Sequence, residues 1–225
     1  MTFDVTPPRD CEDCPRLAAF RRANRLRFPD WSNAPVASFG SGEARLAVIG
    51  LAPGLRGANR TGRPFTGDYA GDLLYATLLE FGFASGRYEA RPDDGLNLED
   101  CAIVNAVRCA PPQNKPTPQE IAACRRYLAG ALSSLQNLRA IVALGRIAHD
   151  SALRSFGLRL ARFPFAHGAI HALPIRDVRL FDSYHCSRYN TNTRVLTPEM
   201  FRAVFASVRA HLIADAARSA VPGEV

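Results

Sequence analysis

Residues 50–68 combine the side chains that a site for a flat, negatively charged ligand requires. This stretch of nineteen residues holds five glycines and two prolines, so its backbone must turn tightly and leave room for a ligand to approach. Arg56, Arg60 and Arg63 supply positive charge, and Phe65 supplies an aromatic face. The stretch therefore predicts a binding loop for a nucleotide, free or within a chain, in preference to a glycine-rich surface turn.

Two widespread phosphate-binding motifs do not fit this loop. No Gly-Lys-Ser or Gly-Lys-Thr follows it, and the spacing of Gly50, Gly54 and Gly57 differs from the Rossmann pattern G-x-G-x-x-G. ATP and NAD are therefore poor candidates for its ligand.

Four of the six cysteines form two pairs that could hold a metal. Two residues separate Cys11 from Cys14, and fourteen separate Cys109 from Cys124. Four thiolates so spaced suit one iron–sulfur cluster or a structural zinc ion, although each pair alone is a weak signal. We favour a metal role for these four. The two other cysteines are expected to be small buried thiols: Cys101 and Cys186.

The size and charge of the chain narrow the class of protein. A chain of 225 residues is long enough for one domain with a substantial core. It has 28 basic residues, nearly all arginine, against 21 acidic residues. This excess of positive charge favours nucleic-acid binding. Residues 1–10 lack a secretory signal pattern, and no run approaches the ~18 apolar residues of a membrane span. We expect a soluble, cytoplasmic monomer with no membrane partner, in a reducing compartment where disulfides are rare.

Four apolar runs are typical of strands that are buried on both faces of a parallel sheet. They cover residues 46–49, 102–107, 140–144 and 178–184. Helical patterns alternate with these runs, which predicts an α/β fold with right-handed crossovers and helices on both faces of the sheet. We expect one domain over residues 1–225, with a core of about 11–215.

Local signals predict where the helices lie. The sequence Thr117-Pro118-Gln119-Glu120 combines an N-cap threonine, a proline in the first turn and a glutamate for a capping box, so a helix begins there. The other expected helices cover residues 11–26, 70–82 and 147–156, and a last one begins at Thr197-Pro198. Residues 163–174 could add an edge strand, and residues 217–225 are expected to form a frayed tail.

Polar residues gather at the carboxyl ends of the expected strands, where ligands bind in parallel sheets. His185 follows the fourth strand; a lone histidine is more often structural, but this position favours a functional role. The loop after it carries Arg188, Tyr189 and Arg194, which suit phosphate contacts and a wedge between bases, although a solvated loop would look similar. The strand ends lead into residues 50–68, 105–114, 145–146 and 185–194.

These segments resemble the family 5 (type B) uracil-DNA glycosylases. The resemblance spans residues 11 to about 205 and rests on four motifs. They are Gly-Leu-Ala-Pro-Gly at 50–54, Gly-Ala-Asn-Arg-Thr-Gly-Arg-Pro-Phe-Thr-Gly-Asp at 57–68, Arg-Cys-Ala-Pro-Pro-Gln-Asn-Lys-Pro at 108–116 and His-Cys-Ser-Arg-Tyr-Asn-Thr at 185–191.

The resemblance implies an α/β/α sandwich around a central four-stranded parallel sheet. It also implies that the protein excises uracil and other deaminated bases, such as hypoxanthine and xanthine, from DNA, and that it holds a [4Fe-4S] cluster. The family's cluster ligands fall on Cys11, Cys14, Cys109 and Cys124, the four cysteines already chosen from their spacing. Hydrolysis requires no electrons, so we expect the cluster to be structural.

The resemblance further implies how the base is bound. The base must be rotated out of the duplex at a cost of a few kcal/mol, and it would then stack on Phe65. Asn105, by its place at a strand end, or Asn114, by its match to the family, would read the uracil edge, and we favour Asn114. The residues expected to line the base site are Gly50, Ala52 and Gly54, and those expected to contact DNA are Arg60, Arg63, Arg188, Tyr189 and Arg194.

Two residues are expected to be catalytic. His185 would donate a hydrogen bond to the base O2 as negative charge develops there. Asp68, which the resemblance marks as the residue that orients water or steadies the sugar cation, also suits the N-cap of the helix over 70–82. Ala52 stands where many relatives have an acidic or amide residue, so it cannot activate water, and its small size suits a roomier pocket.

Two other functions stay open at this point. An iron–sulfur module could bind nucleic acid without catalysis, and it would show salt-sensitive DNA binding with no release of base. A hydrolase of free nucleosides or nucleotides is the other alternative, which the many arginines outside the loop disfavour.

Overall fold

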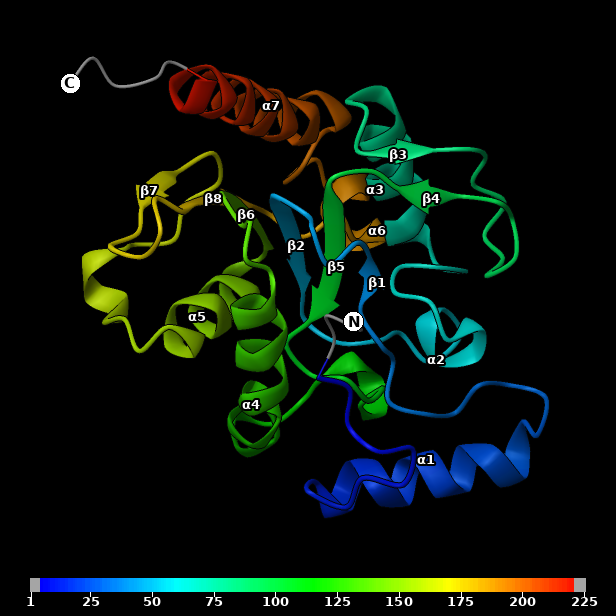
Figure 1. Ribbon diagram of the computed structural model, residues 1–225. Helices are drawn as coiled ribbons and strands as arrows, with labels where there is room; N and C mark the ends of the chain where they lie inside the picture. The colour runs from blue at the N-terminus through cyan, green and yellow to red at the C-terminus, as the bar shows by residue number, and fades with distance from the viewer. Residues whose placement is uncertain (1–4, 221–225) are drawn as a thin grey trace.

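Four parallel strands form the centre of the fold. In the computed structural model, which describes residues 5–220, they lie side by side in the order β5 (Cys101–Asn105), β2 (Leu46–Gly50), β6 (Ala140–Leu144) and β8 (Arg179–Ser183). Every residue of β2, β5 and β6 is buried, as expected for continuous apolar runs. Figure 1 shows β2 and β5 side by side at the middle of the molecule. The predicted four-stranded parallel sheet is confirmed.

Two short antiparallel strands extend this sheet to six strands. β7 (Ile170–Ala172) pairs with β8 and falls within the predicted edge segment, whereas β1 (Phe39–Gly40), which pairs with β5, was not predicted. A separate two-stranded ribbon joins β3 (Ala84–Ser85) and β4 (Asn97–Leu98). Strands of two residues leave no periodic pattern in a sequence, because their hydrogen-bond partners lie far away in the chain.

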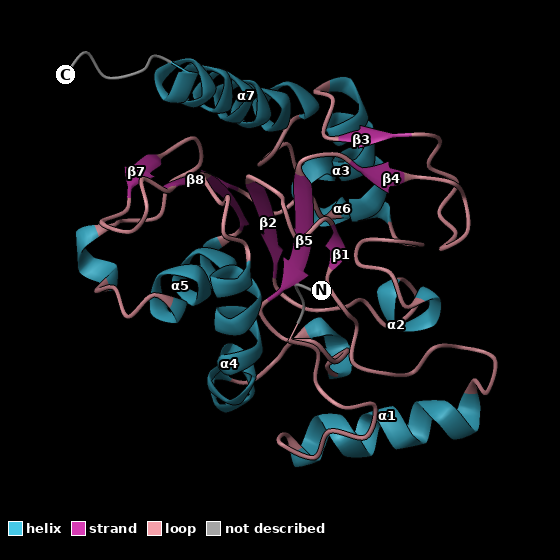
Figure 2. Cartoon of the chain, in the orientation of Figure 1, coloured by secondary structure: helices cyan, strands magenta, loops and turns pink. Residues whose placement is uncertain are grey.

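Helices cover both faces of the sheet, as Figure 2 shows. On one face, α3 (Tyr69–Glu80) and α7 (Pro198–Ala220) pack against alternate residues of β2, including Leu46 and Val48. On the other face, α4 (Pro118–Ser134) and α5 (Arg146–Ser155) pack against the residues between them, such as Ala47. This alternation holds because successive side chains of a strand point to opposite faces. The α/β/α arrangement is therefore confirmed.

The remaining elements are short or peripheral. α1 (Pro15–Arg27) lies at the lower edge of Figure 1 and packs through Leu17 against Cys124 and Tyr127 of α4. Three further short helical elements are α2 (Ala58–Thr61), α6 (Arg188–Asn192) and the turn η1 (Pro112–Asn114). A second turn, η2 (Leu160–Arg162), follows α5.

Local capping chemistry sets the start of α4 as predicted. The Thr117 side chain accepts a hydrogen bond from the Glu120 backbone N–H, and the Glu120 carboxylate accepts one from the Thr117 backbone N–H. The end of the chain differs from the prediction, because α7 continues through residues 217–220, where a frayed tail was expected. Residues 221–225 of that tail lie outside the described residues. None of the helices within residues 5–220 is both long and apolar enough to cross a membrane.

Candidate active site

A cleft of about 580 Å³ opens where β2, β5 and β8 end. Three of the four predicted strand-end segments line it: the loop after β2, the segment after β5 and the segment after β8. The fourth segment, Gly145–Arg146, does not line the cleft, although a Cβ on Gly145 would lie 3.6 Å from the Cβ of His185. The volume is in the range of sites that enclose a small ligand.

Phe65 forms an aromatic wall of the cleft, and its backbone is held in an unusual conformation. Its φ of 52° lies in the left-handed region, which is rare for a bulky residue. The Tyr88 hydroxyl donates a hydrogen bond to the Phe65 carbonyl (3.1 Å), and the Tyr75 hydroxyl donates one to the Pro64 carbonyl (2.6 Å). Two buried or half-buried tyrosines thus hold the backbone that presents the ring.

Gly50 leaves the space in which the Phe65 ring meets Asn105. A Cβ on Gly50 would lie 2.4 Å from Asn105 Oδ1 and 2.7 Å from the nearest ring carbon of Phe65. Both contacts are too short for a side chain, so the end of β2 requires glycine here.

The two candidate asparagines differ in depth. Asn105 is only 2% exposed, and its Oδ1 has no hydrogen-bond partner among residues 5–220. Asn114 is exposed in η1, at the rim, with a left-handed φ of 57°. Both line the cleft, but only Asn105 places an unpaired amide oxygen within its wall. Because a buried polar atom without a partner costs free energy, Asn105 is the group that a ligand would satisfy.

His185 faces the Phe65 ring across the cleft. The centroids of the two rings lie 6.1 Å apart with 29° between their planes. Burial lowers the pKa of His185 to about 4, so its imidazole is neutral near pH 7. The His185 backbone carbonyl accepts a hydrogen bond from Asn190 Nδ2 at 2.8 Å. This bond ties His185 to the helix α6, on which Asn190 lies.

Asp68 caps α3 and also lines the cleft. Its Oδ1 accepts a hydrogen bond from the Gly71 backbone N–H at 3.2 Å, as predicted for an N-cap. A Cβ on Gly57 would lie 2.4 Å from Asp68 Oδ2, and one on Gly54 would lie 3.2 Å from it. The glycines therefore make room for the carboxylate. Burial raises the pKa of Asp68, and the backbone hydrogen bonds of the cap oppose that rise.

The DNA-contact prediction for Arg63 is wrong. Its side chain is 6% exposed and makes a two-pronged ion pair with Asp94, whose side chain is fully buried. Arg63 Nε also donates to Thr66 Oγ1 at 2.7 Å, and the guanidinium lies over the rings of Tyr75 and Tyr88. Every face of the group is engaged, so Arg63 holds the loop after β2 in place and cannot reach a phosphate.

The other predicted DNA contacts are exposed. Arg60 and Arg194 lie on the surface, and Tyr189 is 74% exposed. Arg188 lines the cleft, and its guanidinium lies 5.2 Å from the centroid of the Tyr69 ring. The segment that carries Arg188 and Tyr189 is the helix α6, not the loop that was expected, because the Ser187 side chain caps it by accepting from the Asn190 N–H.

Sequence reasoning missed Tyr69 and Ser187, which also line the cleft. Each is next to a predicted site residue, Asp68 in the case of Tyr69 and Arg188 in the case of Ser187. Their only signal in the sequence is that adjacency, because a tyrosine or serine at a helix start is common without a functional role.

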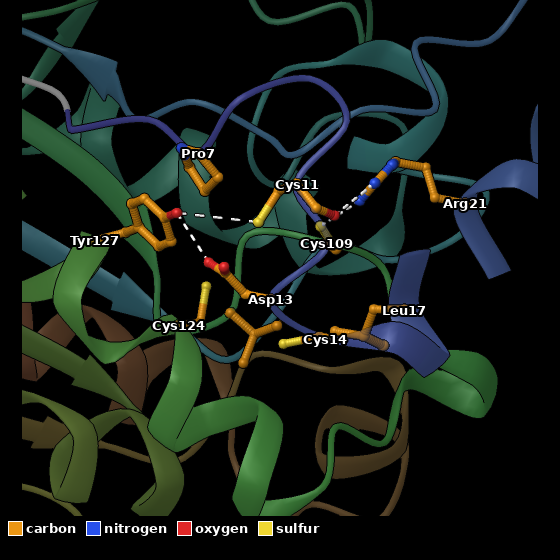
Figure 3. Close-up of a pocket in the computed structure, with 10 residues that line it drawn as sticks. Pro7, Cys11, Asp13, Cys14, Leu17, Arg21, Cys109, Cys124 and Tyr127 are labelled. Atoms are coloured by element: carbon orange, nitrogen blue, oxygen red, sulfur yellow. Dashed lines mark hydrogen bonds between the residues drawn. The ribbon is translucent and has the colours of Figure 1, made fainter. Parts of the chain in front are cut away.

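The four predicted metal-ligating cysteines meet in a second cavity, shown in Figure 3. Cys11 and Cys14 come from the segment before α1, Cys109 follows β5, and Cys124 lies on α4. None of them forms a disulfide. Within the described part of the chain, no three of these sulfur atoms lie within 4.8 Å of one another. Cys101 is fully buried in the core against α3 and α7, as predicted, and so is Cys186.

Donor groups surround these sulfur atoms. Arg21 Nη1 donates a hydrogen bond to Cys109 Sγ at 3.4 Å, and the Arg108 backbone N–H donates one to Cys124 Sγ at 3.3 Å. Burial, followed by the charge of Glu120, raises the pKa of Cys14 to about 11. The two donors favour the thiolate forms of Cys109 and Cys124, whereas burial opposes them. A bound cation would supply the positive charge that four buried thiolates need.

Comparison with known proteins agrees with this geometry. The family model of the uracil DNA glycosylase superfamily matches residues 37–209. The chain is similar to a type-5 uracil-DNA glycosylase from Thermus thermophilus, with 50% identity over 86% of this chain and 90% of that protein. It is also similar to type-5 uracil-DNA glycosylases from Mycobacterium tuberculosis (42% identity, 87% of this chain, 75% of that protein) and Pyrobaculum aerophilum (38% identity, 87% and 86%). From the fold, the cleft and these matches, the chain belongs to the uracil DNA glycosylase superfamily.

Proposed function

We propose that this protein is a DNA glycosylase that hydrolyses the N-glycosidic bond between uracil and deoxyribose. One observation carries the proposal: the Phe65 ring, the unpaired Asn105 amide and the neutral His185 imidazole line the same cleft. An aromatic face, an amide and a neutral donor match the flat ring, the polar edge and the developing charge of a departing uracil. The names of the similar proteins support the same activity.

The Asn105 amide is the better candidate for reading the base. Its Oδ1 can accept a hydrogen bond from uracil N3–H while its Nδ2 donates to O4. Asn114, which the family match favoured, lies exposed at the rim, where water competes for its hydrogen bonds. We therefore assign the uracil edge to Asn105 and a contact near the mouth of the cleft to Asn114.

His185 and Asp68 divide the chemistry of bond cleavage. When the bond breaks, negative charge develops on the base and positive character on the sugar. A neutral His185 can donate a hydrogen bond to base O2, and removing such a donor costs ~2.7 to 4 kcal/mol of barrier. The Asp68 carboxylate can face the sugar, where it steadies the cation or orients the attacking water. Ala52 lines the cleft but offers no polar group for either task.

Binding of DNA would involve the exposed groups around the cleft. Arg60, Arg188 and Arg194 can contact phosphates, and Tyr189 can insert where the base leaves the stack. Rotating the base out costs a few kcal/mol, which these contacts would offset. The small Ala52 beside the base suits hypoxanthine and xanthine as additional substrates, and assays on the three bases in parallel test this breadth.

A [4Fe-4S] cluster is the cofactor that best fits the four cysteines. Sulfur ligands of a single tetrahedral zinc ion lie about 3.8 Å apart, because each Zn–S bond is ~2.3 Å. The sulfur atoms here are spread more widely than that, which suits a cluster of several irons. Bound there, the cluster would supply a structural cross-link between α4, the start of α1 and the segment after β5. Iron and acid-labile sulfide analysis of the purified protein tests it, and zinc alone would refute it.

The activity test is release of free uracil from a duplex with one G·U pair, with a G·C duplex of the same sequence as control. The expected product is free uracil and an alkali-labile abasic site in the G·U duplex alone. Salt-sensitive binding to DNA with no release of base would instead support the non-catalytic iron–sulfur module.

A further inference from the structure

Outside the cleft, two histidines share one buried carboxylate. His149 lies on α5, His171 on β7 and Asp182 on β8. His149 Nδ1 lies 2.7 Å from Asp182 Oδ1, and His171 Nε2 lies 3.2 Å from Asp182 Oδ2. The side chains of His149 and Asp182 are 1% and 0% exposed, and that of His171 is 13% exposed. None of the three lines the cleft.

Both ring nitrogens of His149 face groups that can only accept. Nδ1 faces the Asp182 carboxylate, and Nε2 lies 2.8 Å from the backbone carbonyl of Phe163. A neutral imidazole carries one N–H, so it can satisfy one of these acceptors but not both. Two hydrogen bonds at these lengths require a proton on each nitrogen.

We propose that His149 is a buried imidazolium that clamps the segment of residues 163–171 onto β8 and thereby positions His185.

A metal ion is the competing occupant, and the distances disfavour it. Two nitrogen or oxygen ligands of a tetrahedral zinc lie about 3.3 Å apart, because each bond is ~2.0 to 2.1 Å. The 2.7 Å between His149 Nδ1 and Asp182 Oδ1 is a hydrogen-bond length instead. A shared proton therefore fits this contact better than a shared metal.

The charges around His149 favour the cation. Asp182 faces it from β8, His171 from β7, and Asp150 follows it on α5. Burial lowers the pKa of His149, but the hydrogen bond and charge of Asp182, with the Phe163 carbonyl, outweigh burial and raise it. The Phe165 ring packs edge-on against His149 and lies under the Arg146 guanidinium. The other arginines of the surrounding elements are exposed: Arg154, Arg159, Arg162 and Arg179.

The clamped segment is bonded to β8 next to His185. The Gly168 N–H donates to the Asp182 carbonyl at 2.8 Å, and the Tyr184 N–H donates to His167 Nδ1 at 3.1 Å. Loss of a proton from His149 would leave either Asp182 or the Phe163 carbonyl facing a lone pair. Such a loss loosens the segment that supports Tyr184, the residue directly before His185. His149 is thus a positioning residue, not a catalytic one.

The charge is tested by nitrogen NMR of the intact, cluster-loaded protein labelled with ¹⁵N-histidine. We expect protons on both ring nitrogens of His149 at about pH 7, above the ordinary histidine pKa of ~6.5. A bare nitrogen at that pH, or a stoichiometric metal other than iron in elemental analysis, overturns the proposal. This NMR measurement requires neither a variant nor enzyme activity.

The clamp is tested with His149→Gln, and His211→Gln is the matched control on α7. The pKa of His149 is raised in the folded state. Its contribution to stability is therefore complete below about pH 6.5 and is lost as pH rises through the folded pKa. From about pH 6 to about pH 9 the wild-type Tm should therefore fall further than that of His149→Gln. The Tm of His211→Gln should fall at least as far as that of the wild type, because burial lowers the pKa of His211 and its removal acts in the opposite direction. Equal slopes in all three proteins contradict the clamp.

The link to His185 rests on the proposed glycosylase activity. At about pH 7, His149→Gln should lower kcat for uracil release several-fold and leave KM unchanged, because every cleft residue is retained. An unchanged kcat refutes the positioning role. If the wild-type protein releases no uracil, the proposed function fails instead, and the NMR and Tm measurements still decide the charge and the clamp.

Discussion

Gly50 and Asn105 occupy adjoining positions at the ends of two neighbouring strands, and the glycine leaves the room that the asparagine amide fills. A Cβ on Gly50 would lie 2.4 Å from Asn105 Oδ1. We expect Gly50→Ala to push the amide and the Phe65 ring apart and to lower uracil release roughly 10²-fold, which corresponds to about 2.7 kcal/mol. Single-turnover assays measure this loss. Gly95→Ala is the control: its left-handed φ of 76° makes Ala costly in stability, but a Cβ there meets nothing within 4 Å and the residue does not line the cleft, so activity of the folded protein should stay at the wild-type level.

The different depths of Asn105 and Asn114 predict different costs of their removal. Asn105→Ala removes a buried amide that faces the cleft, so kcat for uracil release should fall about 10²-fold or more. Asn114→Ala removes an exposed group at the rim, and we expect an effect of about tenfold or less. The same assay on both variants compares them directly. If Asn114→Ala loses more kcat than Asn105→Ala, Asn114 is the residue that binds the uracil edge.

A neutral His185 predicts both a catalytic and a pH effect. His185→Gln should reduce kcat by ~10² to 10³, because the donor to base O2 is displaced. The pKa of His185 is about 4 in the folded protein and near 6.5 when unfolded, so the unfolded state binds more protons between these values. Wild-type stability should therefore fall as pH drops from about 6.5 to about 4, and His185→Gln should lose less. Chemical denaturation across this range measures the difference, and parallel pH curves would contradict it.

The buried Arg63–Asp94 pair predicts a stability effect in place of a binding effect. Arg63→Ala leaves the Asp94 carboxylate buried without its partner, which should destabilise the protein by about 3 to 5 kcal/mol. Arg91→Ala, which breaks an exposed pair with Glu89, should change stability little. Denaturant unfolding of both variants tests this expectation.

For the exposed arginines we expect an effect on DNA binding and none on stability. Arg60→Ala and Arg188→Ala should keep the stability of the wild type, weaken DNA binding and lower the salt dependence of binding by about one charge each. Binding titrations at several salt concentrations measure that slope. Wild-type slopes in both variants would remove these arginines from the DNA interface.

The two classes of cysteine predict different iron contents. Cys109→Ser should lose iron and acid-labile sulfide and destabilise the segment after β5, because one of the four proposed cluster ligands is replaced by a poor one. Cys101→Ser, in the core and outside that cavity, should keep its iron. Elemental analysis of both purified variants decides the assignment, and equal iron contents would refute it.

Local patterns were sufficient for much of the fold. The apolar runs at β2, β5 and β6 predict burial on both faces, because a strand with one solvent-exposed face would alternate apolar and polar residues. The capping box at Thr117 needs no distant partner, so it was readable residue by residue. The two-residue strand β1 could not be predicted from local sequence, because it depends on backbone hydrogen bonds to Ala102 and Ile103, more than sixty positions away.

The candidate site divides in the same way. The sequence by itself determined which residues gather at the strand ends and which four cysteines belong together, because topology and spacing depend on chain order. Only the tertiary structure decided that Asn105 is buried while Asn114 is exposed, and that Arg63 is taken by Asp94. Only the structure brought His149 between Asp182 and the Phe163 carbonyl. Burial and partnership of a charged or polar group depend on residues remote in the chain, and no local pattern encodes them.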